Sequence, residues 1–131
     1  MVCLDTSVLV PLLRKEESAL NRLRSEADRG SRVLTTVVSL CELYAGAYAS
    51  RDPPKELKKV ERLLSRLEIL ELTKQASRKY GELLNYPAIR TQPIGDFDLI
   101  IAAIALSAEE VLSTRDPEHF GRVPGLVVEQ W

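Results

Sequence analysis

The chain has few of the residues on which several protein classes depend. Its 131 residues include two cysteines, Cys3 and Cys41, one histidine and one tryptophan, and aromatic side chains make up 5% of the total. Two cysteines in a chain of this size favour reduced core thiols over a disulfide framework or a cysteine-ligated metal. The shortage of aromatic residues argues against an extended platform for stacking nucleic-acid bases.

The sequence also lacks an excess of either charge and any long apolar run. With a net charge of -1, the chain has no overall attraction for nucleic acid, so such a partner must be held by a local basic patch. No apolar run approaches the roughly 18 to 20 residues of a membrane span. Residues 1–5 carry an acid and no basic leader, and we therefore expect a cytoplasmic protein that does not enter a membrane.

Internal repeats and low-complexity segments are absent, and the length is that of one ordinary domain. We therefore expect a single domain over residues 1–131. Hydrophobic residues make up 45% of the chain and charged residues 28%, which is the balance of a globular protein with one core.

Short apolar segments alternate with amphipathic ones in the pattern of an α/β domain. The strand-like segments are 2–4, 32–36, 68–72, 111–114 and 126–128. The helical segments are 8–13, 16–29, 37–49, the stretch after Pro53-Pro54, the stretch from Thr73 to Pro87, and 99–106. Strands separated by helices imply right-handed crossovers, and so a mostly parallel sheet of four to five strands with both faces covered.

The segment from Leu99 to Leu106 contains no polar side chain, so its helix should be buried nearly all round. Two carboxylates, Asp96 and Asp98, stand at its beginning. A charge that enters a core is unfavourable unless it is paired, hydrogen-bonded or bound to a metal. These two residues therefore require an explanation.

Other acidic residues also fall where a strand ends or a helix begins. Asp5 follows the first strand, Glu42 lies early in the helix after the second, and Asp116 comes shortly after the fourth. Each has an ordinary structural explanation. Asp5, Asp96 or Asp98 can favour a helix start, Ser39 and Glu42 match a capping box, and Asp116 can open a turn.

Together, these carboxylates point to a metal site. In a parallel sheet, ligands bind beyond the carboxyl ends of the strands, where all of these residues should lie. Two unit charges 4 Å apart repel by about 4 kcal/mol at an effective dielectric of 20, so a crowd of carboxylates needs a counter-charge. Oxygen ligands suit Mg²⁺ or Mn²⁺, and such ions assist phosphoryl chemistry.

Several motifs, taken in order, resemble a PIN domain, and more narrowly the VapC toxins of bacterial and archaeal toxin–antitoxin pairs. The resemblance covers essentially the whole chain. The motifs are Leu4-Asp5-Thr6-Ser7, Glu42-Leu43, the segment from Pro93 to Ala103, the segment from Ser113 to Phe120, and Val123-Pro124-Gly125-Leu126.

The resemblance implies a three-layer α/β/α sandwich and a metal-dependent endoribonuclease that uses Mg²⁺ or Mn²⁺. Water activated by the metal would attack an RNA phosphodiester in line. The carboxylates that match the family's acidic positions are Asp5, Glu42 and Asp98 as core ligands, Asp116 as an auxiliary ligand, and Asp96 at a position that varies in the family. The hydroxyls that would orient ligands or water are those of Thr6, Ser7 and Thr114.

The resemblance also implies partners, namely a small VapB-like antitoxin and a second copy of the chain in a homodimer. For RNA we look to a locally positive segment and two further arginines: Lys58, Lys59, Arg90 and Arg115. The same lysines also suit a solvated helix face without a function. We interpret His119 as a structural residue of the turn after Asp116, and Cys41 as a helix-packing thiol.

Two other functions are weighed against the nuclease. The first is a catalytically silent PIN-like module that binds RNA or a protein, which the intact acidic set disfavours. The second is a phosphatase or receiver-like domain with a phosphate-accepting aspartate. The haloacid-dehalogenase pattern needs a second Asp two residues after the first, and Ser7 stands at that position.

Overall fold

The computed structural model describes residues 1–131, which form five strands and eight helices. The strands are β1 (Val2–Leu4), β2 (Val33–Thr36), β3 (Glu68–Leu70), β4 (Val111–Thr114) and β5 (Val128–Gln130). The helices are α1 (Thr6–Leu13), α2 (Glu17–Asp28), α3 (Val37–Tyr48), α4 (Pro53–Leu64), α5 (Lys74–Leu84), α6 (Pro87–Thr91), α7 (Asp96–Ser107) and α8 (Pro117–Gly121). None of these helices is long and apolar enough to cross a membrane.

All five strands are parallel and lie in the order β3-β2-β1-β4-β5. The chain therefore moves outward from β1 to β3 on one side and returns to build β4 and β5 on the other. Leu4 of β1 is in register with Ser113 of β4, and Asp5 N–H donates to the Ser113 carbonyl at 3.1 Å. The carboxyl ends of β1 and β4 thus flank the topological switch point, where open α/β sheets bind ligands. The predicted α/β class and parallel sheet are confirmed.

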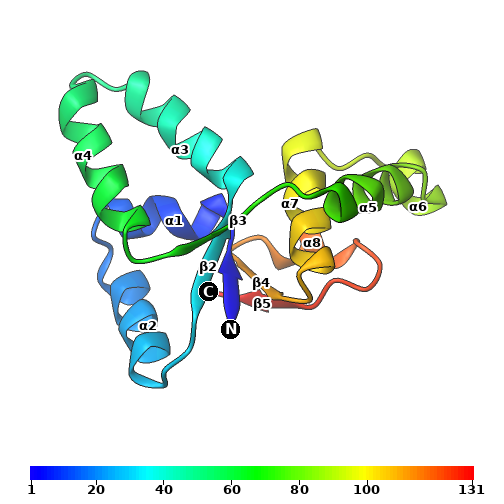
Figure 1. Ribbon diagram of the computed structural model, residues 1–131, viewed down its shortest axis with the longest axis horizontal. Coiled ribbons are helices and arrows are strands. Elements are labelled where there is room, and N and C mark those ends of the chain that lie inside the picture. Colours follow the sequence, from blue (N-terminus) through cyan, green and yellow to red (C-terminus); the bar gives the residue numbers. More distant parts are fainter.

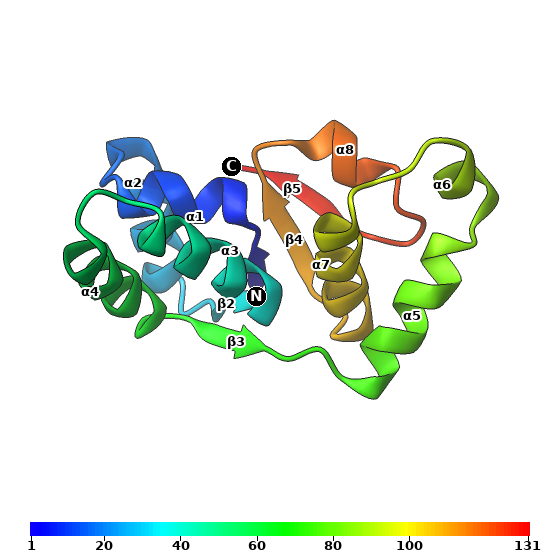
Figure 2. The ribbon, with the colours of Figure 1, turned by 90° about the horizontal axis from the view of Figure 1, so that it is seen from above.

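Helices cover both sides of this sheet. In Figure 1, α1 to α4 lie to the left of the strands and α5 to α7 to the right, and Figure 2 shows the same division from above. Each side has its own apolar core. One core is built around Leu99 to Ala105 of α7 and the other around Val8, Leu9 and Leu12 of α1. The three-layer arrangement expected from the sequence is therefore present.

Helix α7 is buried as its apolar sequence predicts. Leu99, Ala102, Ala103 and Ala105 are fully buried, and α5 packs along this helix. Asp98 lies in the first turn of α7 and is half-buried. Because the helix is held by core packing on nearly every side, the position of its first turn is fixed.

The structure corrects several details at element ends. Pro87 does not simply end the preceding helix. It begins α6, because a proline suits the first position of a helix, where its missing N–H is not needed. The last strand begins at Val128, not at residue 126, and β3 ends at Leu70. Helix α1 begins at Thr6, before the expected residue 8, and contains Pro11 in its second turn.

The two cysteines are free, as expected, but only one belongs to the core. Cys3 is fully buried, and burial raises the pKa of its thiol to about 12. Cys41 is exposed on α3, so its interpretation as a packing thiol is wrong. Neither cysteine contributes to a metal-ligand cluster.

Candidate active site

Asp5 is the first residue after β1, and its carboxylate is buried at the carboxyl edge of the sheet. Its residue exposure is 4%. Oδ1 accepts a hydrogen bond from Ser7 Oγ at 2.6 Å and Oδ2 accepts one from Thr114 Oγ1 at 2.9 Å. The side chain does not cap α1, so the ordinary structural explanation for this aspartate is not realised. Asp5 has no basic partner.

Burial raises the pKa of the Asp5 carboxyl above its ordinary value, and the negative charge of Asp98 raises it further. The hydrogen bonds from Ser7 and Thr114 act in the opposite direction, because they favour the ionised form. Asp98 is therefore close enough to repel Asp5. Asp5 has no basic partner and Asp98 pairs only with the ring of His119, so a cation at this edge would lower the free energy.

Ser7 and Thr114 connect the ends of the two central strands. Ser7 Oγ accepts from the backbone N–H of Arg115 at 2.9 Å, and Thr114 Oγ1 accepts from that of Asp116 at 3.0 Å. The two hydroxyl oxygens lie 3.3 Å apart. Both side chains thus have an acceptor role toward the β4 end and a donor role toward Asp5, which fixes the carboxylate's orientation.

Glu42 lies in α3, which begins where β2 ends, and is tethered to the start of α1. Thr6 Oγ1 donates to Glu42 Oε1 at 2.7 Å. The capping box that Ser39 and Glu42 suggest is not formed, because the cap of α3 is Thr36, whose side chain accepts from Ser39 N–H. Glu42 is therefore held by a neighbour from another element and points toward the β1 end.

Asp98 and Asp96 separate at the start of α7. Asp98 Oδ2 lies 2.9 Å from His119 Nε2. Asp96 is exposed and accepts a hydrogen bond from Tyr80 on α5 at 3.3 Å. Neither caps the helix, since Gly95 occupies the N-cap position without a side-chain bond. The structure therefore connects Asp98 with the β4 side of the edge and Asp96 with α5.

Asp116 has the capping role that its sequence context suggests. It is the N-cap of α8, and its carboxylate accepts from His119 N–H at 3.3 Å. It is also exposed and adjoins Thr114 through its own N–H. Capping uses one of its two carboxylate oxygens, so it retains an oxygen for a further ligand.

The side chains present fit a hard cation, although they do not form a closed cage. No three His, Cys, Asp or Glu side chains converge closely enough to hold an ion on their own. Mg²⁺ is usually held by one or two carboxylates, with water and substrate phosphate filling the other positions. A buried carboxylate without a cationic partner, next to a second carboxylate, is suited to this open type of site.

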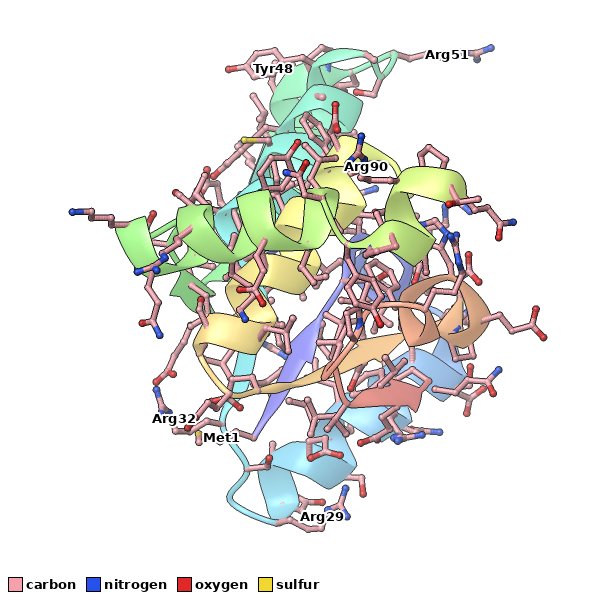
Figure 3. All side chains as sticks on the ribbon, turned by 90° about the vertical axis from the view of Figure 1, so that its right-hand side faces the viewer. Met1, Arg29, Arg32, Tyr48, Arg51 and Arg90 are labelled. Atoms are coloured by element: carbon pink, nitrogen blue, oxygen red, sulfur yellow. The ribbon has the colours of Figure 1, made fainter.

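Of the basic side chains predicted to contact RNA, two are exposed and two form ion pairs. Lys58 and Arg90 are exposed, whereas Lys59 pairs with Glu56 at 3.1 Å and Arg115 Nη1 donates to Glu16 at 3.2 Å. Figure 3 shows Arg90 toward the carboxyl end of β1, and Met1 and Arg32 at the opposite end.

Sequence reasoning missed two features of this edge. His119, the only histidine, does more than form a turn, since its ring contacts Asp98. Arg14, which we did not single out, lines a cavity of about 370 Å³ beside Glu42 together with Lys59. Neither contact has a signal in the sequence, because each depends on how separate helices approach one another.

Comparisons with known proteins agree with this architecture. A family model described as PIN domain matches residues 2–126. The chain is 32% identical to Ribonuclease VapC2 of Rickettsia felis, over 98% of this chain and 96% of that protein. It is 36% identical to the tRNA(fMet)-specific endonuclease VapC of Salmonella typhimurium, over 77% and 76%. It superposes with a TM-score of 0.92 and 29% identity on a chain of Rickettsia felis VapBC2 bound to promoter DNA, covering 100% of this chain and 99% of the other.

The raised pKa of Asp5 predicts that Asp5→Asn stabilises the metal-free protein at neutral pH. Ionised Asp5 is less favourable in the folded state than in the unfolded chain, so replacing it removes a penalty. The gain should be about 1 kcal/mol, the usual scale of a single stabilising substitution. As the pH falls through the raised pKa toward roughly 3.9, the ordinary value for Asp, wild type becomes protonated and the gain should vanish.

Urea denaturation in EDTA at pH 7.5 and pH 4 measures this difference. Asp28→Asn, which removes an exposed carboxylate at the end of α2, serves as the matched control and should change stability little at either pH. A destabilised Asp5→Asn protein at pH 7.5, or a gain that persists unchanged at pH 4, would contradict the prediction.

Proposed function

This chain belongs to the PIN domain family, and from that premise we propose that it is an endoribonuclease, the VapC-type toxin of a toxin–antitoxin pair. The observation that carries the proposal is the buried Asp5 carboxylate beside Asp98, without a basic partner, at the switch point of the sheet. Relatives that match over nearly their whole length are named ribonucleases, which supports the same activity here.

We propose Mg²⁺ or Mn²⁺ as the metal. The side chains that would hold it are the carboxylates of Asp5, Glu42 and Asp98, with Asp116 as an auxiliary ligand. Asp96 is the weakest member, because it turns toward Tyr80. A bound ion of this class lowers the pKa of its water and stabilises negative charge on a phosphate.

The remaining side chains of the edge orient these ligands. Ser7 and Thr114 hold both oxygens of Asp5, and Thr6 holds Glu42. Each of these hydroxyls donates to a carboxylate that would be bound to the metal, and none is paired with a histidine or lysine that would activate it as a nucleophile. The arrangement therefore favours attack by water on the RNA phosphodiester.

The RNA backbone would be held by cations on both sides of the edge. We propose Lys58, Lys59, Arg90 and Arg115 for this role, and add Arg14 because it shares a cavity with Glu42. Lys59 and Arg115 would exchange their partial partners, Glu56 and Glu16, for phosphate. Such local cations are needed because the chain has a net charge of -1.

We also propose that the antitoxin docks in an apolar groove between α2 and α4. Two adjoining cavities of about 350 and 260 Å³ share Leu20, Leu23 and Arg66 in their linings. Arg24 and Arg62 are further cations on these walls. An apolar floor with basic walls suits an amphipathic protein segment with acidic flanks better than it suits RNA. The solved relatives named VapBC are toxin–antitoxin assemblies, which supports a VapB-like partner.

In this proposal, residues 1–131 act as one domain, as a homodimer, in the cytoplasm, where RNA and the antitoxin are made. The silent PIN-like module remains the second candidate, because no ready cluster of three ligands is formed. Titration of Mn²⁺ into the RNA-free chain separates the two, since a silent module has no need to bind the ion.

For the nuclease, we predict that Asp98→Asn lowers RNA cleavage by roughly 100-fold or more, the scale seen when one group is removed from a pre-organised site. EDTA should abolish cleavage by wild type, and excess Mg²⁺ or Mn²⁺ should restore it. The assay is cleavage of total RNA by the purified chain, with Asp28→Asn as the control that keeps full activity. Equal cleavage by wild type and a folded Asp98→Asn protein would refute the site assignment.

For RNA binding, we predict a change in salt dependence. Replacing one phosphate-contacting cation by alanine should reduce the slope of log K against log salt by about 0.7 for a single strand. Binding is measured in the Asp98→Asn background for Lys58→Ala, Lys59→Ala, Arg90→Ala and Arg115→Ala. Arg32→Ala, at the far end of the molecule in Figure 3, should leave the slope unchanged. If all five variants behave alike, these residues do not form the RNA surface.

For the antitoxin, we predict that Arg66→Glu weakens binding of the antitoxin encoded with this chain by at least about tenfold, because like charges would face each other. RNA cleavage by the free toxin should be unchanged. Arg51→Glu is the control, since Arg51 is exposed between α3 and α4 and lines neither cavity of the groove. Undiminished binding by Arg66→Glu would place the antitoxin on another surface.

A further inference from the structure

The ring of His119 on α8 reaches across to the first turn of α7. Its Nε2 atom lies 2.9 Å from Asp98 Oδ2, although the two residues are 21 positions apart in the chain. An ionised carboxylate can only accept hydrogen bonds. The ring therefore carries its hydrogen on Nε2 and donates it to Asp98. Asp98 makes no other hydrogen bond to a protein side chain.

The imidazole is held in place from a second direction. It packs edge-on against Phe120, with ring centroids 5.3 Å apart and an interplanar angle of 82°. Phe120 itself is buried in the core, at 2% exposure. Because the ring rests on a fixed neighbour, its Nε2–H is aimed at Asp98 before any ligand arrives.

His119 also completes a chain of hydrogen bonds that joins the carboxylates of the site. Its backbone N–H donates to Asp116, Asp116 N–H donates to Thr114, and Thr114 donates to Asp5. The path thus runs from Asp98 through α8 and the end of β4 to the end of β1. A displacement of His119 would therefore move Asp98, which contacts the His119 ring, and Asp116, which accepts the His119 backbone N–H.

We propose that His119 is a positioning residue for Asp98. Its Nε2–H fixes Oδ2, which leaves Oδ1 as the oxygen available to a metal ion. This inference rests on the proposed function, because it concerns the metal affinity of the same site. Partners that orient a ligand in this way typically contribute 10- to 100-fold to metal affinity. A purely structural role in the turn would affect folding stability and leave metal affinity unchanged.

The test is calorimetric titration of Mn²⁺ into the RNA-free full chain. His119→Phe keeps an aromatic ring against Phe120 but removes the donor, and should weaken Mn²⁺ binding by about 10- to 100-fold. His119→Gln restores an N–H donor at similar reach and should bind within about threefold of wild type. Glu118→Ala, an exposed change on the same helix, is the matched control. Thermal denaturation in EDTA checks that each variant is folded.

The outcomes separate this inference from the proposed function. If wild type binds no Mn²⁺, the metal-dependent nuclease fails and the role of His119 fails with it. If wild type binds and a folded His119→Phe protein binds equally well or more tightly, the positioning role is wrong while the nuclease stands. If His119→Gln is as weak as His119→Phe, the donor is not what matters, and the inference is overturned.

Discussion

The site depends on the burial of one negative charge, Asp5, at the end of the central strand. A carboxylate at 4% exposure without a basic partner is unfavourable in the metal-free protein, and burial is the largest cause of its raised pKa. The surrounding hydroxyls reduce this penalty without neutralising the charge. This unfavourable free energy favours binding of a cation. If a lysine or arginine already neutralised Asp5, binding a cation there would lower the free energy much less.

The sheet topology determines which residues can share that charge. Because β2 and β3 are added on one side of β1 and β4 and β5 on the other, the carboxyl ends of β1 and β4 are neighbours. Asp5 and Glu42 come from the α1–α4 side, and Asp98 and Asp116 come from the α7–α8 side. One apolar core packs each side. The carboxylates therefore lie along an edge between two packed parts, where no three of them converge closely enough to hold an ion on their own.

The sequence predicted the elements that are marked by a continuous apolar run with clear ends. The strands at 2–4 and 111–114 and the buried helix after Asp98 follow directly from their apolar runs. The last strand was misplaced by two residues because Leu126 and Val127 are apolar, whereas two of the three residues of β5 are polar. The contact of His119 with Asp98 was missed because it forms only where α8 approaches the first turn of α7. Asp96 separates from Asp98 because residues two apart on a helix do not share a face, and its contact with Tyr80 on another helix has no signal in the sequence.

The contact between Thr114 and Asp5 joins residues 109 positions apart, and this separation has a consequence for synthesis. At roughly 5 to 20 residues per second, about 5 to 20 seconds pass between the translation of Asp5 and that of Thr114. During that interval the amino-terminal half can already pack its own core, but Asp5 has neither its second donor nor its neighbour Asp98 in place. The hydrogen-bonded edge around Asp5 therefore forms only after the chain has been translated as far as Thr114.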